Sequence, residues 1–155
     1  MPTFETQLAS VVVKNITGCT ELLEVERLSG GASQETYRLK VVLNGMATPL
    51  AMRRTPGGEY VEALPSHPGL DVEALLMQSA KAVGVPEPEV YHVLTREDDL
   101  GDGFIMEWIE GEALGARITR DRQFASIRPT LAKACGEILA RIHGIDLDQS
   151  GLRSR

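Results

Sequence analysis

The sequence predicts an α+β fold in which three helices accompany a five-stranded antiparallel sheet. Apolar residues recur at helical spacing in three stretches, and five shorter stretches, rich in β-branched and aliphatic residues, lie between turn-forming residues. The chain has 155 residues, which suits one ordinary domain, and a chain of this size buries roughly two-thirds of its unfolded surface. The predicted order is helix, three strands, helix, two strands, helix.

Composition and charge exclude several classes of function. The chain carries 16 Lys+Arg and 22 Asp+Glu, a net charge of −6, so we expect no nucleic-acid partner. No apolar run approaches the roughly 18 residues that cross a bilayer, and the N-terminus lacks the basic region of a signal peptide. Cys19 and Cys135 are far apart and form no disulfide or zinc pattern. We expect a cytoplasmic protein without a membrane partner.

The first half of the chain predicts a helix and a three-stranded meander. Leu8 and Val12 share one face of a helix that starts at Phe4 and ends near Gly18. The tight-turn dipeptide Asn44-Gly45 joins the second and third strands. The three strands are predicted over residues 22–28, 36–43 and 50–54.

The second half predicts a helix, two strands and a last helix. Gly84 ends the first of these helices, and residues 111–128 form a charged linker with irregular helix. In the last helix, Leu131, Ile138 and Ile142 lie on one apolar face. The predicted ranges are residues 71–83 for the helix, 90–94 and 104–109 for the strands, and 129–143 for the last helix.

A glycine-rich segment between the first two strands is the sharpest local feature. Glycine lets the backbone approach a ligand without a Cβ in the way, and consecutive N–H groups can cradle a phosphate. A plain flexible hairpin loop is the alternative interpretation. The candidate residues are Gly30, Gly31, Ala32, Ser33 and Gln34.

Arg53 and Glu73 are candidate polar groups on the predicted sheet and helix. Because side chains alternate along a strand, Arg53 and Arg54 face opposite sides, so at most one can reach a bound phosphate. Glu73 lies near the start of the next helix, where the helix dipole favours a carboxylate. The alternatives are a solvated arginine and an ordinary carboxylate of the first helical turn.

The last predicted strand runs through Glu107, Trp108 and Ile109 toward Gly111. An apolar strand that enters a glycine-bounded connector offers backbone groups to the edge of a planar heterocycle and apolar walls to its faces. A core strand followed by a turn is the alternative, in which Trp108 serves packing.

The order of these features resembles the amino-terminal lobe of the protein-kinase-like fold. More closely, the chain is similar to the aminoglycoside phosphotransferase and choline kinase-like family, in the branch that includes kinase-like domains fused to some acyl-CoA dehydrogenases. The resemblance runs from about residue 20 to the end of the chain. It is carried by residues 28–37 (LSGGASQETY), 52–58 (MRRTPGG), 84–88 (GVPEP), 104–111 (FIMEWIEG) and 139–143 (LARIH), the last with Asp146 and Gly151-Leu152.

The resemblance implies a division of the chain and roles for the candidate residues. The kinase-like amino-terminal lobe would span residues 1–110, a hinge 111–128, and the start of an incomplete helical carboxy-terminal lobe 129–155. Arg53 would stand where kinases place the lysine that touches the α- and β-phosphates, and Glu73, on the αC-like helix, would be its ion-pair partner. The nucleotide phosphates would lie under residues 30–34.

The same resemblance implies ATP or GTP with Mg²⁺ as cofactors and a small-molecule hydroxyl as acceptor. Glu107, Trp108 and Ile109 would line the base through backbone groups. Arginine in place of lysine departs from the kinase pattern, because a planar guanidinium changes the contact geometry.

The catalytic loop of the family, with its His, Asp and downstream Asn, has no match in this chain. The only asparagines are Asn15 and Asn44, so we assign no catalytic residue and no metal ligand. We expect a fragment or a naturally shortened protein that is inactive by itself, the nucleotide-binding portion of a small-molecule phosphotransferase. A non-catalytic nucleotide-binding or protein-interaction module is the alternative. We also expect self-association through the apolar face of the last helix.

Overall fold

The computed structural model describes residues 2–29, 33–62 and 68–154. It has the predicted α+β fold, with five strands in one antiparallel sheet of order β1-β2-β3-β5-β4. The helices and strands are α1 (Phe4–Asn15), β1 (Cys19–Arg27), β2 (Glu35–Leu43), β3 (Met46–Arg54), α2 (Leu70–Ala82), β4 (Val90–Val93), β5 (Gly103–Glu107), α3 (Gly115–Arg120) and α4 (Arg128–His143).

The helix α1 begins where a side chain can satisfy its first backbone donors. The Thr3 hydroxyl accepts a hydrogen bond from the Thr6 N–H at 3.3 Å. Leu8, Val11 and Val12 are buried against the sheet, as the helical spacing predicts.

The meander is confirmed, and its strands are longer than predicted. Asn44 and Gly45 both have positive φ, 51° and 79°, as a two-residue hairpin turn of type I′ requires. Because this tight turn holds the two strands in register up to the pair Leu43 and Met46, β3 begins at Met46 and not at residue 50. On the other side of the meander, β1 begins at Cys19 and not at residue 22.

The prediction that the fifth strand continues to Ile109 is wrong. In the structure β5 pairs with β3 only from Leu50 to Arg54, and its last residue, Glu107, lies opposite Leu50. The next position of β3 is Pro49, which has no N–H to donate to a further strand. The ladder therefore stops, and Trp108 and Ile109 belong to the connector.

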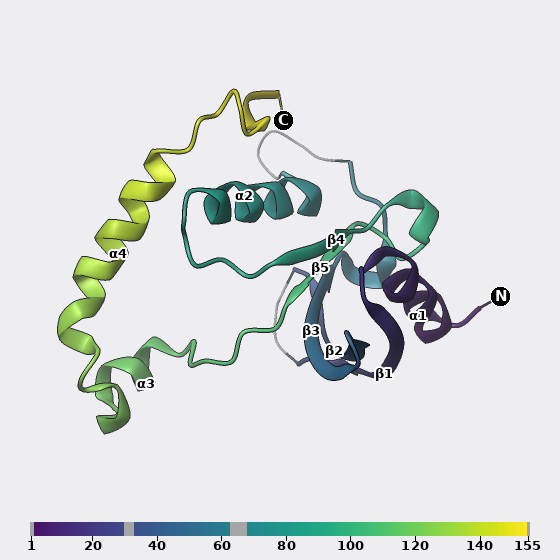
Figure 1. Cartoon of the computed structure of the whole chain (residues 1–155), viewed down its shortest axis with the longest axis horizontal. Helices are drawn as coiled ribbons and strands as arrows, with labels where there is room; N and C mark the ends of the chain where they lie inside the picture. The colour runs from purple at the N-terminus through teal and green to yellow at the C-terminus, as the bar shows by residue number, and fades with distance from the viewer. Residues whose placement is uncertain (1, 30–32, 63–67, 155) are drawn as a thin grey trace.

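The two faces of the sheet are covered differently (Figure 1). Helix α1 covers one face, where the largest buried side chains are Leu8, Leu39, Leu50, Met52 and Ile105. The apolar side of helix α2 covers the other face over β4 and β5, where Leu70, Ala74, Val90 and Phe104 form a smaller cluster. We call these the α1 face and the α2 face.

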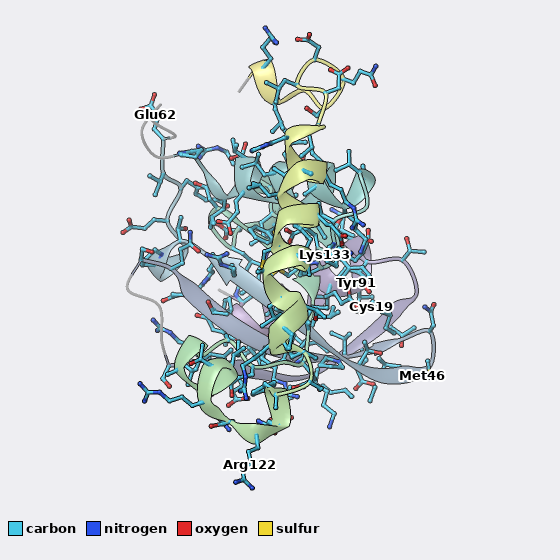
Figure 2. The ribbon with its side chains drawn as sticks, turned by 90° about the vertical axis from the view of Figure 1, so that its left-hand side faces the viewer. Cys19, Met46, Glu62, Tyr91, Arg122 and Lys133 are labelled. Carbon is cyan, nitrogen blue, oxygen red and sulfur yellow. The ribbon has the colours of Figure 1, made fainter. Side chains whose placement is uncertain are left out.

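The chain leaves the sheet after β5 and runs through α3 to α4, which stands in front of the sheet in Figure 2. Helix α3 lies in the segment where the sequence predicts irregular helix. No residue of α4 is buried, and the end of α4 reaches the end of α2 through a hydrogen bond of 2.9 Å from Arg141 Nη1 to the Gly84 carbonyl.

Among the described residues, no helix is long and apolar enough to span a bilayer.

Candidate functional site

Arg53 lies on the α2 face of β3 and connects two distant parts of the chain. Its Nη1 donates to Glu73 Oε1 in the first turn of α2, and its Nη2 donates to Gln34 Oε1, directly before β2. The ion pair between Arg53 and Glu73 that the resemblance implies is thus present. The guanidinium has five N–H donors in a planar fork, so these two bonds leave donors for a further acceptor.

The pair is accessible to a ligand. The side chains of Arg53 and Glu73 are 32% and 35% exposed, so water and solutes reach both groups. Gln34 is half-buried and Ser33 is exposed. Gly30, Gly31 and Ala32, the first three residues of the predicted phosphate-binding segment, lie outside the described residues. The described end of that segment, Gln34, is bound to Arg53.

Arg54, the next residue, points to the α1 face and forms a buried network there. Its Nε donates to Glu35 Oε2 at 2.8 Å, its Nη2 donates to the Tyr37 hydroxyl at 3.2 Å, and its Nη1 donates to the Leu100 carbonyl at 3.2 Å. The guanidinium carbon also lies 4.2 Å from the centre of the Phe4 ring. The prediction that the two arginines face opposite sides is confirmed, and only Arg53 is on the open side.

Burial and hydrogen bonding act in opposite directions on Glu35. Burial raises the pKa of this carboxyl, but hydrogen bonds from Tyr37, from the Gly57 backbone and from Arg54 lower it further, so the pKa of Glu35 lies below its usual value. Burial and the hydrogen bond to Glu35 raise the pKa of Tyr37. Glu35 is therefore a carboxylate at neutral pH, and it anchors the end of the glycine-rich segment to β3.

The three predicted residues of the connector are arranged in three ways. Glu107 ends β5, and its side chain accepts a hydrogen bond of 3.1 Å from the Glu89 N–H, so the carboxylate binds the backbone before β4. Trp108 packs outside both hydrophobic clusters, and its Nε1 donates to Glu110 Oε1 at 2.8 Å. Ile109 is 58% exposed. Trp108 is half-buried and lies beyond the end of β5. Its role, as a packing residue or as a wall of the base site, stays a prediction.

A hollow lies further along the α2 face, on the side of Arg38 that is away from Arg53. Its four charged side chains are two glutamates and two cations, so it offers no net positive charge to a phosphate. In the sheet register Glu24 lies opposite Lys40, and Glu26 lies opposite Arg38. The hollow is lined by Glu24, Glu26, Arg38, Lys40, Ala47 and Pro49.

A metal cluster is not found within the part of the chain that the structure describes. Residues 2–29, 33–62 and 68–154 contain no group of three or more His, Cys, Asp and Glu side chains that could hold a metal ion. Arg53 and the open α2 face beside it fit an anion such as a phosphate, because a guanidinium binds phosphate oxygens in a fork.

The sequence pattern does not reveal the network of Glu35, Tyr37 and Arg54. Each of these residues is an ordinary strand residue in the sequence, and the network forms because β2 and β3 place Glu35 opposite Arg54. The one available signal is the position of Glu35, in register with the apolar residues Leu39 and Val41 on the inward face of the strand.

Comparison with known proteins identifies the family of the chain. The model of the phosphotransferase enzyme family matches residues 24–155. Acyl-CoA dehydrogenase family member 10 of Mus musculus is 27% identical to the chain, over 97% of the chain and 13% of its own length. The chain thus spans 13% of the length of this curated relative. Since the family match covers far more than half of the 155 residues, the chain belongs to the phosphotransferase enzyme family, as the resemblance predicts.

Proposed function

We propose that this chain is the nucleotide-binding part of a phosphotransferase that moves the γ-phosphate of ATP or GTP to a hydroxyl group of a small molecule. The observation that carries the proposal is the position of Arg53. Its guanidinium lies on the open face of the sheet, between Glu73 of α2 and Gln34 at the end of the glycine-rich segment. Such a cation orients the α- and β-phosphates when a kinase binds its nucleotide with Mg²⁺.

The hydrogen bonds of Arg53 prepare it for this role. Glu73 and Gln34 hold the guanidinium from two sides, so less side-chain freedom is lost when phosphate oxygens bind the remaining donors. Residues 107–109, at the end of β5 and in the connector, would offer backbone groups to the base. The Glu107 N–H is already donated to the Glu89 carbonyl, so the free groups are those of Trp108 and Ile109 and the Glu107 carbonyl. The acceptor pocket is not assigned to residues of this chain.

The binding step is tested by titrating the chain with ATP and GTP in the presence of Mg²⁺ by calorimetry. We expect binding by the wild type and a loss of about 10- to 100-fold in Arg53→Met, because a hydrogen bond to a charged group contributes about 1.5–3 kcal/mol. Arg53→Lys restores the cation and should recover part of the affinity. Absence of binding by the folded wild-type chain at millimolar nucleotide contradicts the proposal.

The transfer step is tested on the protein as its source cells make it, because this chain spans 13% of the length of the relative. The denatured mass is measured first and compared with the 16.9 kDa of this chain. Transfer of labelled γ-phosphate to hydroxyl compounds is then assayed with Mg²⁺. Binding without transfer favours the second candidate, a non-catalytic binding module, for which the arginine at position 53 is the motivating observation.

Self-association through α4 stays a prediction. Leu139 and Ile142 are 51% and 39% exposed on this helix, and apolar surface of this kind favours association. Sedimentation of the chain over a range of concentrations measures it, and a monomer at every concentration contradicts the prediction.

A further inference from the structure

The α2 face carries a second arginine, Arg38, in contact with the connector after β5. Its guanidinium carbon lies 4.8 Å from the centre of the Trp108 ring, and its Nη2 lies 3.5 Å from Glu110 Oε1. The same carboxylate oxygen accepts the hydrogen bond from Trp108 Nε1 at 2.8 Å. We call these three residues the Arg38 clasp. Because β3 lies between β2 and β5, the clasp spans β3.

The sheet register places the clasp beside the phosphate-binding end of the candidate site. Thr36 lies opposite Arg53, and Arg38 lies opposite Ala51, two residues along each strand. Two strand residues correspond to roughly 7 Å. Arg53, Ala51 and Arg38 therefore lie on the same face, with Arg38 beside Ala51 on the neighbouring strand. Going along β3 from Arg53 to Ala51 is also going toward the end of β5 and the connector.

A nucleotide whose phosphates bind Arg53 would extend along this face to Arg38. The opposite direction along β3 leads to Gly103, opposite Arg54, where β5 begins, so the base and the connector meet only on the side of Arg38. An arginine guanidinium is flat and weakly hydrated and stacks on aromatic faces. Arg38 already stacks on the indole of Trp108, and 45% of its side chain is still exposed, so it has surface left for a second flat group.

We propose that Arg38 covers the base of the bound nucleotide and determines the affinity of the site for that base. The guanidinium would lie against the base on one side and against Trp108 on the other, while Glu110 keeps it in place. This inference rests on the proposed function, because it takes the ligand of Arg53 to be a nucleotide.

The experiment compares two ligands on four proteins. Mg²⁺-ATP has a base, and Mg²⁺-tripolyphosphate presents a similar charge without one. Both are titrated by calorimetry into the wild-type chain, Arg38→Ala, Arg38→Lys and Lys40→Ala. Lys40 is the matched control, because it lies on the same strand and face and loses the same charge, two residues beyond the clasp. Trp108 is the single tryptophan of the chain, so its fluorescence reports the clasp directly.

We expect Arg38→Ala to weaken ATP binding about tenfold, the usual effect of a lost stacking contact, and tripolyphosphate binding less than about twofold. Lys40→Ala should change both affinities less than about twofold. Arg38→Lys keeps the charge but not the flat group, so its affinity for ATP should resemble that of Arg38→Ala. ATP should change the Trp108 fluorescence of the wild type, and tripolyphosphate should not.

Two results overturn the inference and leave the proposed function standing. One is unchanged ATP affinity in Arg38→Ala. The other is an equal loss of affinity for ATP and tripolyphosphate in Arg38→Ala, which would show that Arg38 attracts the phosphates through its charge and does not contact the base. A wild-type chain that binds neither ligand overturns the proposed function and this inference together. Circular dichroism melts of all variants show that each is folded at the temperature of the titrations.

Discussion

Arg53 and Arg54, adjacent in the chain, point to opposite faces of the sheet and differ in exposure and in their partners. Arg54 points to the α1 face, where its side chain is 11% exposed and paired with Glu35, which is 8% exposed. Arg53 points to the α2 face, where its side chain is 32% exposed and paired with Glu73, which is 35% exposed. Residues of one type, adjacent in the chain, thus enter two environments because side chains of a strand alternate.

The difference shows which face serves stability and which one is open to a ligand. On the α1 face, Arg54 is surrounded by hydrogen-bond acceptors and aromatic rings of the protein, and these interactions stabilise its charge. On the α2 face the apolar side of the helix covers β4 and β5, and Arg53 and Arg38 remain in reach of solvent. Buried charges that lose a partner are costly, whereas exposed pairs contribute little to stability.

The largest expected effect comes from removing the charge on the α1 face. Arg54→Met leaves the buried Glu35 with only the exposed Arg27, 3.0 Å away, as its cation. The loss of one partner of a buried pair costs about 3–5 kcal/mol of unfolding free energy. Arg53→Met removes a pair that is about one-third exposed and should cost less than about 1 kcal/mol. Urea unfolding followed by circular dichroism measures both.

Nucleotide affinity should show the opposite order. Arg53→Met loses binding, and Arg54→Met keeps it at a temperature at which the variant is folded. If Arg54→Met does not fold, Tyr37→Phe tests the same network, because it removes the hydroxyl that binds Glu35 at 2.8 Å and should cost about 1–2 kcal/mol. Equal stability losses in the two arginine variants would show that the faces do not differ in this way.

The order of the elements and the opposite orientation of the two arginines could be predicted from the sequence, because both depend on local periodicity. The hairpin at Asn44-Gly45 could be predicted too, since this dipeptide accepts positive φ at both positions. The ion pair of Arg53 with Glu73 came from the family resemblance and not from local pattern. Its nucleotide-binding role stays a prediction.

The contacts that could not be predicted join residues far apart in the chain. The insertion of β5 between β3 and β4 depends on long-range pairing, which local pattern does not encode. Arg38 and Trp108 are brought together only by that strand order. The end of β5 was predicted two residues too late, because the effect of Pro49 is visible only when its cross-strand position is known.

The second largest effect concerns a close backbone approach beside the α1 face. Gly101 has a φ of +85°, and a Cβ there would lie 2.4 Å from the Gly58 carbonyl carbon. Gly101→Ala should cost about 2–4 kcal/mol, since backbone strain of about 1–3 kcal/mol adds to the displacement of Gly58. Gly57→Ala is the control, because Gly57 also has a positive φ, +68°, but nothing lies within 4 Å of its Cβ position. Similar melting temperatures for the two variants would contradict the close approach.

The third effect is a pH dependence at Asp98, which joins α1 to the loop after β4. Burial raises the pKa of this carboxyl, but hydrogen bonds from the Thr95 backbone, from His92 and from the Thr95 hydroxyl lower it further, so the net shift is downward. Its Oδ1 also accepts a hydrogen bond of 3.3 Å from Asn15. A carboxyl whose pKa is lowered in the folded state stabilises the fold at pH values above its pKa in the unfolded chain, about 4. This contribution is lost as the pH falls through the pKa of the folded state.

Asp98→Asn should therefore cost about 1–3 kcal/mol at pH 7 and progressively less below about pH 4. Unfolding free energies at a series of pH values measure the difference. The unfolding free energy of the variant still decreases as the pH falls, because the pKa of Glu35 is lowered as well. Parallel pH curves for the wild type and the variant would exclude the assigned role of Asp98.

The smallest effect has the opposite sign and lies beyond the open face, in α4. Gly136 is inside this helix, is exposed, and has no atom within 4 Å of its Cβ position. Because alanine loses less backbone freedom than glycine in a helix, Gly136→Ala should stabilise α4 by about 0.5–1 kcal/mol, with a slightly higher melting temperature and more helical signal at 222 nm. A loss of stability instead would mean that another surface packs closely against Gly136, and sedimentation of the variant would show whether that surface belongs to a second copy of the chain. A glycine-to-alanine substitution should therefore destabilise the protein at Gly101, where the backbone is closely packed beside the α1 face, and stabilise it at Gly136, where α4 packs on neither face.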